Sequence, residues 1–319
     1  MHTTTVERYI AINGFDRDMS VNPQRYRYTV SLTGYTSNGL HGTYKNIEWL
    51  SATSLIIPME IVQPATSMTA PKPFFNQEFS LAVPYVMLAI DGFDGTYDGT
   101  NETIRRAFAM FVYHRSYKAP NGRGYVLMEP AQDERRVFQT PLASLRDLSV
   151  SILKPNGALF NNSVDRTMVS MLQYDIANRI LLKVVCETYF DRNEYYPGDD
   201  VMIRGFHAEP PSGGGGAGFA SLNAYINRRE GHEVVQLGPP NDQGFYKTFF
   251  ILAPGVLDQG AGRVITDENM LSAVAAISAT PSLVTKRGML LNVSLQNVIT
   301  LRVGTHASDP TPMIAPIGV

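Results

Sequence analysis

The chain has 319 residues, a formal net charge of −2 and only 18% charged residues. The near-neutral balance and the lack of a Lys/Arg-rich run exclude the electrostatic footprint of a nucleic-acid-binding protein. The single cysteine, Cys186, excludes an intramolecular disulfide and indicates a reducing compartment. The apolar runs are far shorter than the ~20 residues that cross a bilayer. The polar start MHTTTVERY lacks a signal-peptide core, so we expect a soluble protein.

The first 45 residues are expected to form an amino-terminal arm. Within them, Tyr9 to Asn13 and Tyr26 to Leu32 are strand-like, and Asn38-Gly39 predicts a turn.

Eight apolar or alternating runs follow in residues 46–207, where we expect a β-sandwich or barrel. In Leu148 to Ile152 every second residue is apolar, which predicts a strand with one buried face. A strand from Val137 to Thr140 is expected to end at a corner marked by Pro141. The runs are Ile47–Ile57, Phe79–Ile90, Phe108–Tyr117, Gly124–Met128, Arg136–Thr140, Leu148–Leu153, Ile180–Tyr189 and Val201–Gly205.

Two helical segments interrupt this pattern. Asn101 can cap a first helical turn that leads into the strand starting near Phe108. Ser163 to Tyr174 is interpreted as a short helix in the connection after the sixth strand.

Residues 208–218 are rich in Gly and Pro and are interpreted as a flexible linker to a mixed carboxy-terminal extension, residues 219–319. The extension is predicted to begin with a helix whose carboxy-terminal cap is Gly231. We then expect a strand from Phe245 to Leu252 and a helix from Thr266 to Ser278, followed by one or two strands from Met289 to Val303. The tail from His306 is expected to be extended and to lie on a neighbouring protein.

Five segments, in order along the chain, resemble the jelly-roll minor capsid proteins of nucleocytoplasmic large DNA viruses. They are INGFDRD with RYRYTV, PLASLRDLSVSILKPNG followed by FNNSVD, TYFDRNEYYPGDDVMIR, INRREGHEVVQLG and LLNVSLQNVI. The resemblance implies an all-β fold with a jelly-roll-like β-sandwich at 46–207 and a non-enzymatic role in the capsid shell, after assembly in the host cytoplasm. It implies as partners the major capsid protein and other minor capsid proteins, with self-association. It also implies no direct contact with nucleic acid, and a position close to an inner membrane without insertion. The expected role is to bridge or cement major capsomers.

The residues themselves offer weak candidates for chemistry, and we expect no catalytic, cofactor or metal site. Asp94 to Gly99 begins like a calcium loop, with oxygen ligands at Asp94, Thr96 and Asp98. The twelfth position, where a Glu should bind the cation, is Arg105. A solvated Asp/Gly turn is the alternative interpretation.

Two groups of carboxylates are candidates for a glycosidase-like pair: Glu187, Asp191 and Glu194 at one strand end, and Asp133 and Glu134 in another loop. The six histidines share no metal-binding spacing, and His232 is interpreted as a turn residue. The glycine run 213–216 is no phosphate loop, because no Gly-Lys-Ser/Thr follows. Sequons at Asn101, Asn161 and Asn292 are expected to be unused, and Cys186 is interpreted as a core residue.

The motif Phe15-Asp16-Arg17-Asp18 recurs as Phe190-Asp191-Arg192-Asn193. One interpretation is a turn at a strand end, where Asp accepts backbone N–H groups and Arg pairs with a carboxylate. The other is a docking point between subunits through Arg17 or Arg192. A glycan-binding or fibre-like β-sandwich module, using some of the 16 Tyr and 15 Phe, remains the alternative function.

Overall fold

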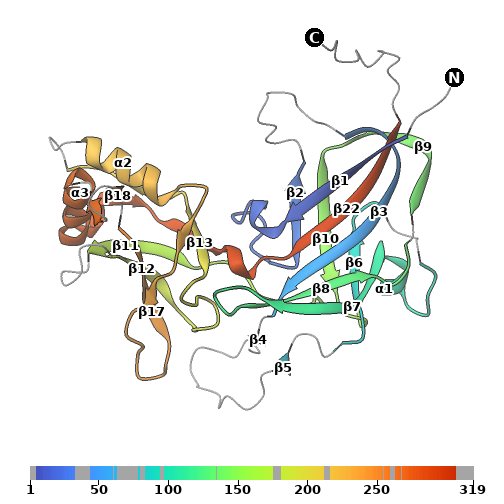
Figure 1. Ribbon diagram of the computed structural model, residues 1–319, viewed down its shortest axis with the longest axis horizontal. Coiled ribbons are helices and arrows are strands. Elements are labelled where there is room, and N and C mark those ends of the chain that lie inside the picture. The colour runs from blue at the N-terminus through green and yellow to red at the C-terminus, as the bar shows by residue number, and fades with distance from the viewer. Residues whose placement is uncertain are drawn as a thin grey trace, which may run out of the picture.

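The protein is all-β and consists of two lobes, each built on a curled antiparallel sheet (Figure 1). A computed structural model describes residues 5–32, 44–59, 61–62, 78–79, 83–93, 97–133, 135–174, 181–211, 216–253, 255–258, 263–266 and 268–306. Each lobe has its own hydrophobic core, and a small third cluster lies between them.

The first lobe contains a nine-stranded sheet made from the two ends of the described chain. Eight strands follow one another across the sheet, and β9 (Arg136–Leu145) adds to one end of β3. The order is β1 (Thr5–Asn13), β22 (Val298–His306), β3 (Tyr44–Pro58), β8 (Gly124–Pro130), β7 (Ala109–Lys118), β6 (Val86–Ile90), β10 (Asp147–Leu153) and β2 (Arg27–Ser31). The sheet curls around a core to which all nine strands contribute. This sandwich-like form follows from the alternation of apolar residues, as in β10, where Leu148, Val150 and Ile152 are buried.

The second lobe contains a seven-stranded sheet with two helices packed on it. α2 (Gly216–Ile226) and α3 (Glu268–Ala279) contribute Leu222, Val274 and Ile277 to the core of this sheet (Figure 1). The strand order is β15 (His232–Glu233), β13 (Asp200–Arg204), β21 (Gly288–Asn292), β11 (Met168–Tyr174), β12 (Leu181–Phe190), β17 (Tyr246–Leu252) and β16 (Gln236–Leu237).

Short elements connect or border these sheets. Three two-stranded ribbons pair β4 with β5, β14 with β20, and β18 with β19. Their bounds are β4 (Ile61–Val62), β5 (Glu78–Phe79), β14 (His207–Ala208), β20 (Val284–Lys286), β18 (Gly255–Asp258) and β19 (Arg263–Thr266). The remaining helical turns are α1 (Glu102–Arg105), η1 (Gly14–Asp16), η2 (Pro281–Leu283) and η3 (Val293–Leu295).

The structure divides the chain differently from the expected arm, sandwich, linker and extension at 1–45, 46–207, 208–218 and 219–319. Within the expected arm, β1 and β2 are integral strands of the first sheet. β11 to β13, expected in the sandwich, lie in the second sheet, and β22, expected in the extension, returns to the first. The described ends of the Gly/Pro segment supply β14 and the start of α2, and residues 212–215 lie outside the described residues. Long-range pairing decides these boundaries, and local composition does not encode it.

Most predicted strands are confirmed, and one predicted element is wrong. The helix expected at Ser163 to Tyr174 is replaced by β11. The buried residues Val169 and Leu172 are three positions apart, which imitates helical spacing. A register shift between Val169 and Met171 produces that spacing in a strand, because it inserts an extra residue opposite β12.

Three further boundaries differ from those expected. β9 continues through Pro141, since residues 138–141 lie in an irregularity opposite β3 where a proline breaks no regular ladder. The run Phe79 to Ile90 is divided between β5 and β6. Gly231 has a left-handed φ of 76° but closes the turn after α2, which ends at Ile226.

Candidate interaction site

A buried ion cluster joins the two lobes where the chain passes between them. The fully buried carboxylate of Asp165, in the connection between β10 and β11, pairs with two arginines. Arg17 donates to its Oδ2, and Arg25 donates to its Oδ1 through Nε at 3.0 Å and Nη2 at 2.8 Å. Gln296, beside β22, donates to Oδ2 at 3.2 Å and accepts from Arg17 at 2.5 Å. Burial of these charges is tolerated because each has several hydrogen-bond partners.

Contacts from the second lobe complete this junction. Arg204 on β13 donates to the backbone C=O of Phe15 at 2.7 Å and of Arg17 at 3.3 Å. Beside it, Met19 packs against Met202 and Leu291 in the small third cluster. The loop between β1 and β2 is therefore held by both lobes.

A second ion pair fixes the hairpin of β7 and β8 to the other lobe. Arg123 donates to both oxygens of the buried Asp199 carboxylate, at 2.8 and 2.5 Å. Asn292 donates to the same carboxylate at 2.8 Å, and Asn121 donates to the C=O of Gly198 at 2.9 Å. A bidentate Arg–carboxylate pair sets orientation as well as distance, so the two lobes are held in one arrangement.

The repeated Phe-Asp-Arg motif forms strand-end turns in both places. Asp18 accepts from the Ser20 hydroxyl and N–H, and these bonds lower the pKa of Asp18. Asp191 likewise accepts from the Asn193 N–H at 2.7 Å. Arg17 is fully buried, so the docking interpretation is wrong for this residue, whereas the exposed Arg192 lies over the Tyr196 ring.

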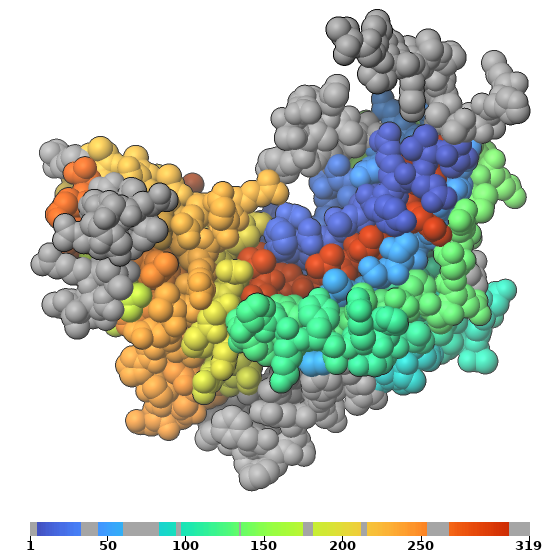
Figure 2. Space-filling view, in the orientation of Figure 1, coloured from blue at the N-terminus to red at the C-terminus, as the bar shows by residue number. Residues whose placement is uncertain are grey.

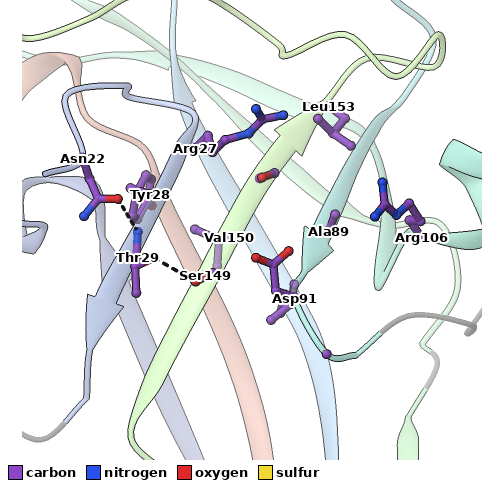
Figure 3. Close-up of a pocket in the computed structure, with 13 residues that line it drawn as sticks. Asn22, Arg27, Tyr28, Thr29, Ala89, Asp91, Arg106, Ser149, Val150 and Leu153 are labelled. Atoms are coloured by element: carbon purple, nitrogen blue, oxygen red, sulfur yellow. Dashed lines mark hydrogen bonds between the residues drawn. The ribbon is translucent and has the colours of Figure 1, made fainter.

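A polar hollow lies on the outer face of β2, β10 and β6, with a volume of about 670 Å³ (Figure 3). Its floor consists of the short side chains of Thr29, Ser149 and Ala89, and the Thr29 and Ser149 hydroxyls are 2.8 Å apart. Arg27, Arg106 and Asp91 also line it. Such a hollow suits a ligand rich in hydroxyl groups, because it offers both donors and acceptors.

A second surface feature surrounds Trp49, on the outer face of β1, β22 and β3. The guanidinium groups of Arg135 and Arg302 lie over its ring, 4.3 and 5.4 Å from the ring centroid. Gly304 makes room for the ring, since a Cβ there would lie 2.1 Å from the indole nitrogen. Beside it, Tyr9 and Val137 are each 65% exposed. We define the Trp49 patch as Trp49, Arg135, Arg302, Tyr9 and Val137. Tryptophan, tyrosine and arginine are the residues most often found at the centres of protein interfaces.

Of the residues considered for chemistry, Asp191 and Glu194 lie together in one strand-end turn, where the Asp191 N–H donates to a carboxylate oxygen of Glu194 at 2.9 Å. Asp94 and Thr96 lie outside the described residues, as does Glu134, so the calcium-like loop is only partly seen. Glu187 pairs with Arg287 at 2.5 Å, and Asp133 pairs with Arg302. No cluster of three or more His, Cys, Asp or Glu able to hold a metal ion occurs among the described residues, and none of their helices could span a membrane.

The other singled-out residues have structural positions. Asn101 caps α1 by accepting from the Ile104 N–H at 2.9 Å, as predicted. Asn161 and Asn292 are buried, which leaves no room for a glycan. Cys186 is a core residue, as interpreted. His232 is a buried residue of strand β15 instead of a turn residue, and its Nε2 lies 3.1 Å from the Ile226 C=O.

No protein-family model matches the sequence, and a search of the curated proteins found no significant relative. Sequence reasoning missed Arg25, Asp165, Asp199 and the Trp49 patch as functional candidates. Their partners lie far away in the sequence, so spacing gave no signal. The available hint was that Arg17, Arg25 and Asp165 all fall in the five segments singled out in the sequence.

Proposed function

We propose that this chain is a minor capsid protein of a large icosahedral double-stranded DNA virus. It bridges or cements neighbouring capsomers of the major capsid protein within the shell, beside other minor capsid proteins. It acts by binding and carries out no catalysis. The first lobe is the counterpart of the jelly roll in the capsid proteins that the sequence resembles.

The observation that supports this role is the double connection between the lobes. The Asp165 cluster and the Arg123–Asp199 pair hold two β-sheets in one orientation, with both carboxylates fully buried. A protein that spans two neighbours must resist bending between its contact surfaces. Buried, multiply bonded ion pairs provide that resistance, because rotating one lobe would leave charges unpaired.

The outer surfaces supply weak contacts that add together in a lattice. The Trp49 patch belongs to the first lobe, and Tyr189 on the second lobe is 53% exposed. When several such surfaces engage at once, avidity exceeds the affinity of each contact by orders of magnitude. In this position within the shell, the protein lies close to the inner membrane of the virion but does not insert into it.

The test is a cryo-electron-microscopy map of the virion of the virus that encodes this chain. We expect density for both lobes beneath or between major capsomers, in a single relative orientation. A companion experiment adds the purified chain to major capsid protein and compares wild type with Arg135→Ala, taking the exposed Arg192→Ala as the matched control. Purified particles that lack the chain would overturn the proposal.

The polar hollow favours a second candidate, a glycan-binding or fibre-like module on the virion surface. Its hydroxyl-lined floor and its flanking arginines suit a sugar. A glycan array separates the two functions: binding that is lost in Ser149→Leu supports the module, and an array without signal removes it.

A further inference from the structure

The outer edge of β1 presents unpaired backbone groups. β1 pairs with β22 along all nine residues without a register shift, and no described strand pairs with its other side. The Gly14 N–H donates to the Asn297 C=O at 2.9 Å, and the Thr305 hydroxyl donates to the Val6 C=O at 3.2 Å. The even-numbered residues therefore face β22. Because backbone groups alternate sides along a strand, those of Glu7, Tyr9 and Ala11 point outward.

In the described part of the chain, this edge has few of the usual protections against pairing with another strand; its only charged residues are Glu7 and Arg8. Natural edge strands are interrupted by proline, lysine or a bulge, or are very short. β1 has nine residues, lacks proline and lysine, and is regular. Its side chains from Thr5 to Tyr9 are all exposed, and it lies on the surface of the first lobe in Figure 2. By contrast, the opposite edge strand β2 is partly blocked, since Asn22 accepts from the Thr29 N–H at 3.3 Å.

We propose that β1 pairs with β1 of a second copy of this chain, antiparallel and across a two-fold axis at Tyr9. Tyr9 is the middle residue of Thr5–Asn13, so this register overlaps all nine residues. It places Tyr9 opposite Tyr9, Glu7 opposite Ala11 and Arg8 opposite Ile10. Aromatic cross-strand pairs are favourable, and no like charges face each other.

Two-fold axes at the neighbouring residues of β1 give less favourable pairings. An axis at Glu7 would oppose two carboxylates, and an axis at Arg8 would oppose two guanidinium groups, both destabilising arrangements. An axis at Ile10 leaves only seven residues overlapping, and one at Ala11 leaves five. Charge and overlap therefore select the Tyr9 axis.

The dimer extends each first-lobe sheet into the other and brings two Trp49 patches together through Tyr9. An isologous contact of this kind closes at two copies, so it does not propagate into fibres. Formation of this dimer does not depend on the proposed capsid role, because two purified chains in solution are sufficient for it.

The primary test introduces a cysteine at the axis. In a hydrogen-bonded antiparallel pair the Cα atoms are about 5.5 Å apart, within the range that a disulfide spans. Under mild oxidation, Tyr9→Cys should form a disulfide-linked dimer. The native Cys186 is buried, and burial raises its pKa to about 12, so it gives little background. The matched control is Tyr189→Cys, an exposed strand tyrosine of the second lobe, which should not become disulfide-linked.

Two more cysteines test the register. Glu7→Cys alone should not link, because two such residues would be displaced by four positions, or about 13 Å at ~3.3 Å per residue. A mixture of Glu7→Cys and Ala11→Cys should link, since these positions face each other. Linking of Glu7→Cys alone would overturn the Tyr9 register.

A proline substitution in β1 distinguishes loss of the dimer from unfolding of the protein. The Ala11 N–H points away from β22, so Ala11→Pro removes a dimer hydrogen bond and spares the pairing within the lobe. We expect loss of the dimer in sedimentation analysis with little change in thermal unfolding, whereas Ala11→Ser should keep the dimer. A wild-type chain that remains monomeric at all concentrations, together with Tyr9→Cys linking no faster than Tyr189→Cys, would show that the edge does not pair with itself.

Discussion

Arg25 and Asp165 are 140 positions apart in the sequence, yet both Nε and Nη2 of the arginine donate to the same carboxylate oxygen. Arg25 precedes β2 of the first lobe, and Asp165 lies in the connection that leads into the second. The pair, together with Arg17, marks the point where the chain passes from one lobe to the other. The stability of the molecule should therefore depend strongly on this carboxylate.

Asp165→Asn should lower the free energy of unfolding by about 3–5 kcal/mol, since it leaves two buried guanidinium groups without their counter-charge. Urea denaturation followed by circular dichroism measures this loss. The control is Asp133→Asn, which breaks a pair whose carboxylate is 70% exposed and should cost no more than about 1 kcal/mol. Equal effects of the two substitutions would contradict a special role for the buried cluster.

Gly304→Ala should displace the Trp49 ring, because the new methyl group would lie 2.1 Å from the indole nitrogen. We expect a loss of about 1–3 kcal/mol in the free energy of unfolding. Trp49 is the only tryptophan and is 7% exposed, so a red shift of its fluorescence should accompany the loss. Gly216→Ala, which meets no atom within 4 Å, should leave the emission unchanged. An unshifted spectrum in Gly304→Ala would show that the ring does not depend on this glycine.

His232 should make the protein less stable in mild acid. Burial, with a smaller effect from Arg228, lowers the pKa of His232 to about 4. The unfolded chain therefore takes up this proton first as the pH falls. The free energy of unfolding should drop by about 1.4 kcal/mol per pH unit between about pH 6.5 and 4, roughly 3 kcal/mol in all, with no further loss below.

Denaturation of wild type and His232→Gln at several pH values isolates this contribution, because other titrating groups are common to both. The slope over that window should be shallower in the variant. Parallel curves for wild type and His232→Gln would rule out this histidine as the source.

Cys186 should resist thiol reagents in the folded protein. Its side chain is buried, and burial raises the pKa of the thiol to about 12, whereas the thiolate is the reactive form. Reaction with a chromogenic disulfide should be slow in buffer and rapid in denaturant. Fast labelling without denaturant would mean that the core of the second lobe opens readily.

The all-β class and most strands were predictable, because the alternation of apolar and polar residues along a strand reflects which side chains are buried, as in β10. The helix predicted at Ser163 to Tyr174 failed because a bulge in β11 gives Val169 and Leu172 a helical spacing. Residues of the interaction site were harder still. Arg123 and Asp199 meet only after both lobes have formed, and no local pattern encodes a pairing across 76 positions.

β22 lies between β1 and β3 in the first sheet, although the whole second lobe precedes it in the sequence. On the ribosome, the second lobe can therefore close while the first still lacks a central strand. β1 has no partner in the sheet until residues 298–306 emerge, and neither does the side of β3 that β22 will cover. A chain that stops before residue 298 therefore leaves β1 without its partner strand and the first sheet divided between β1 and β3.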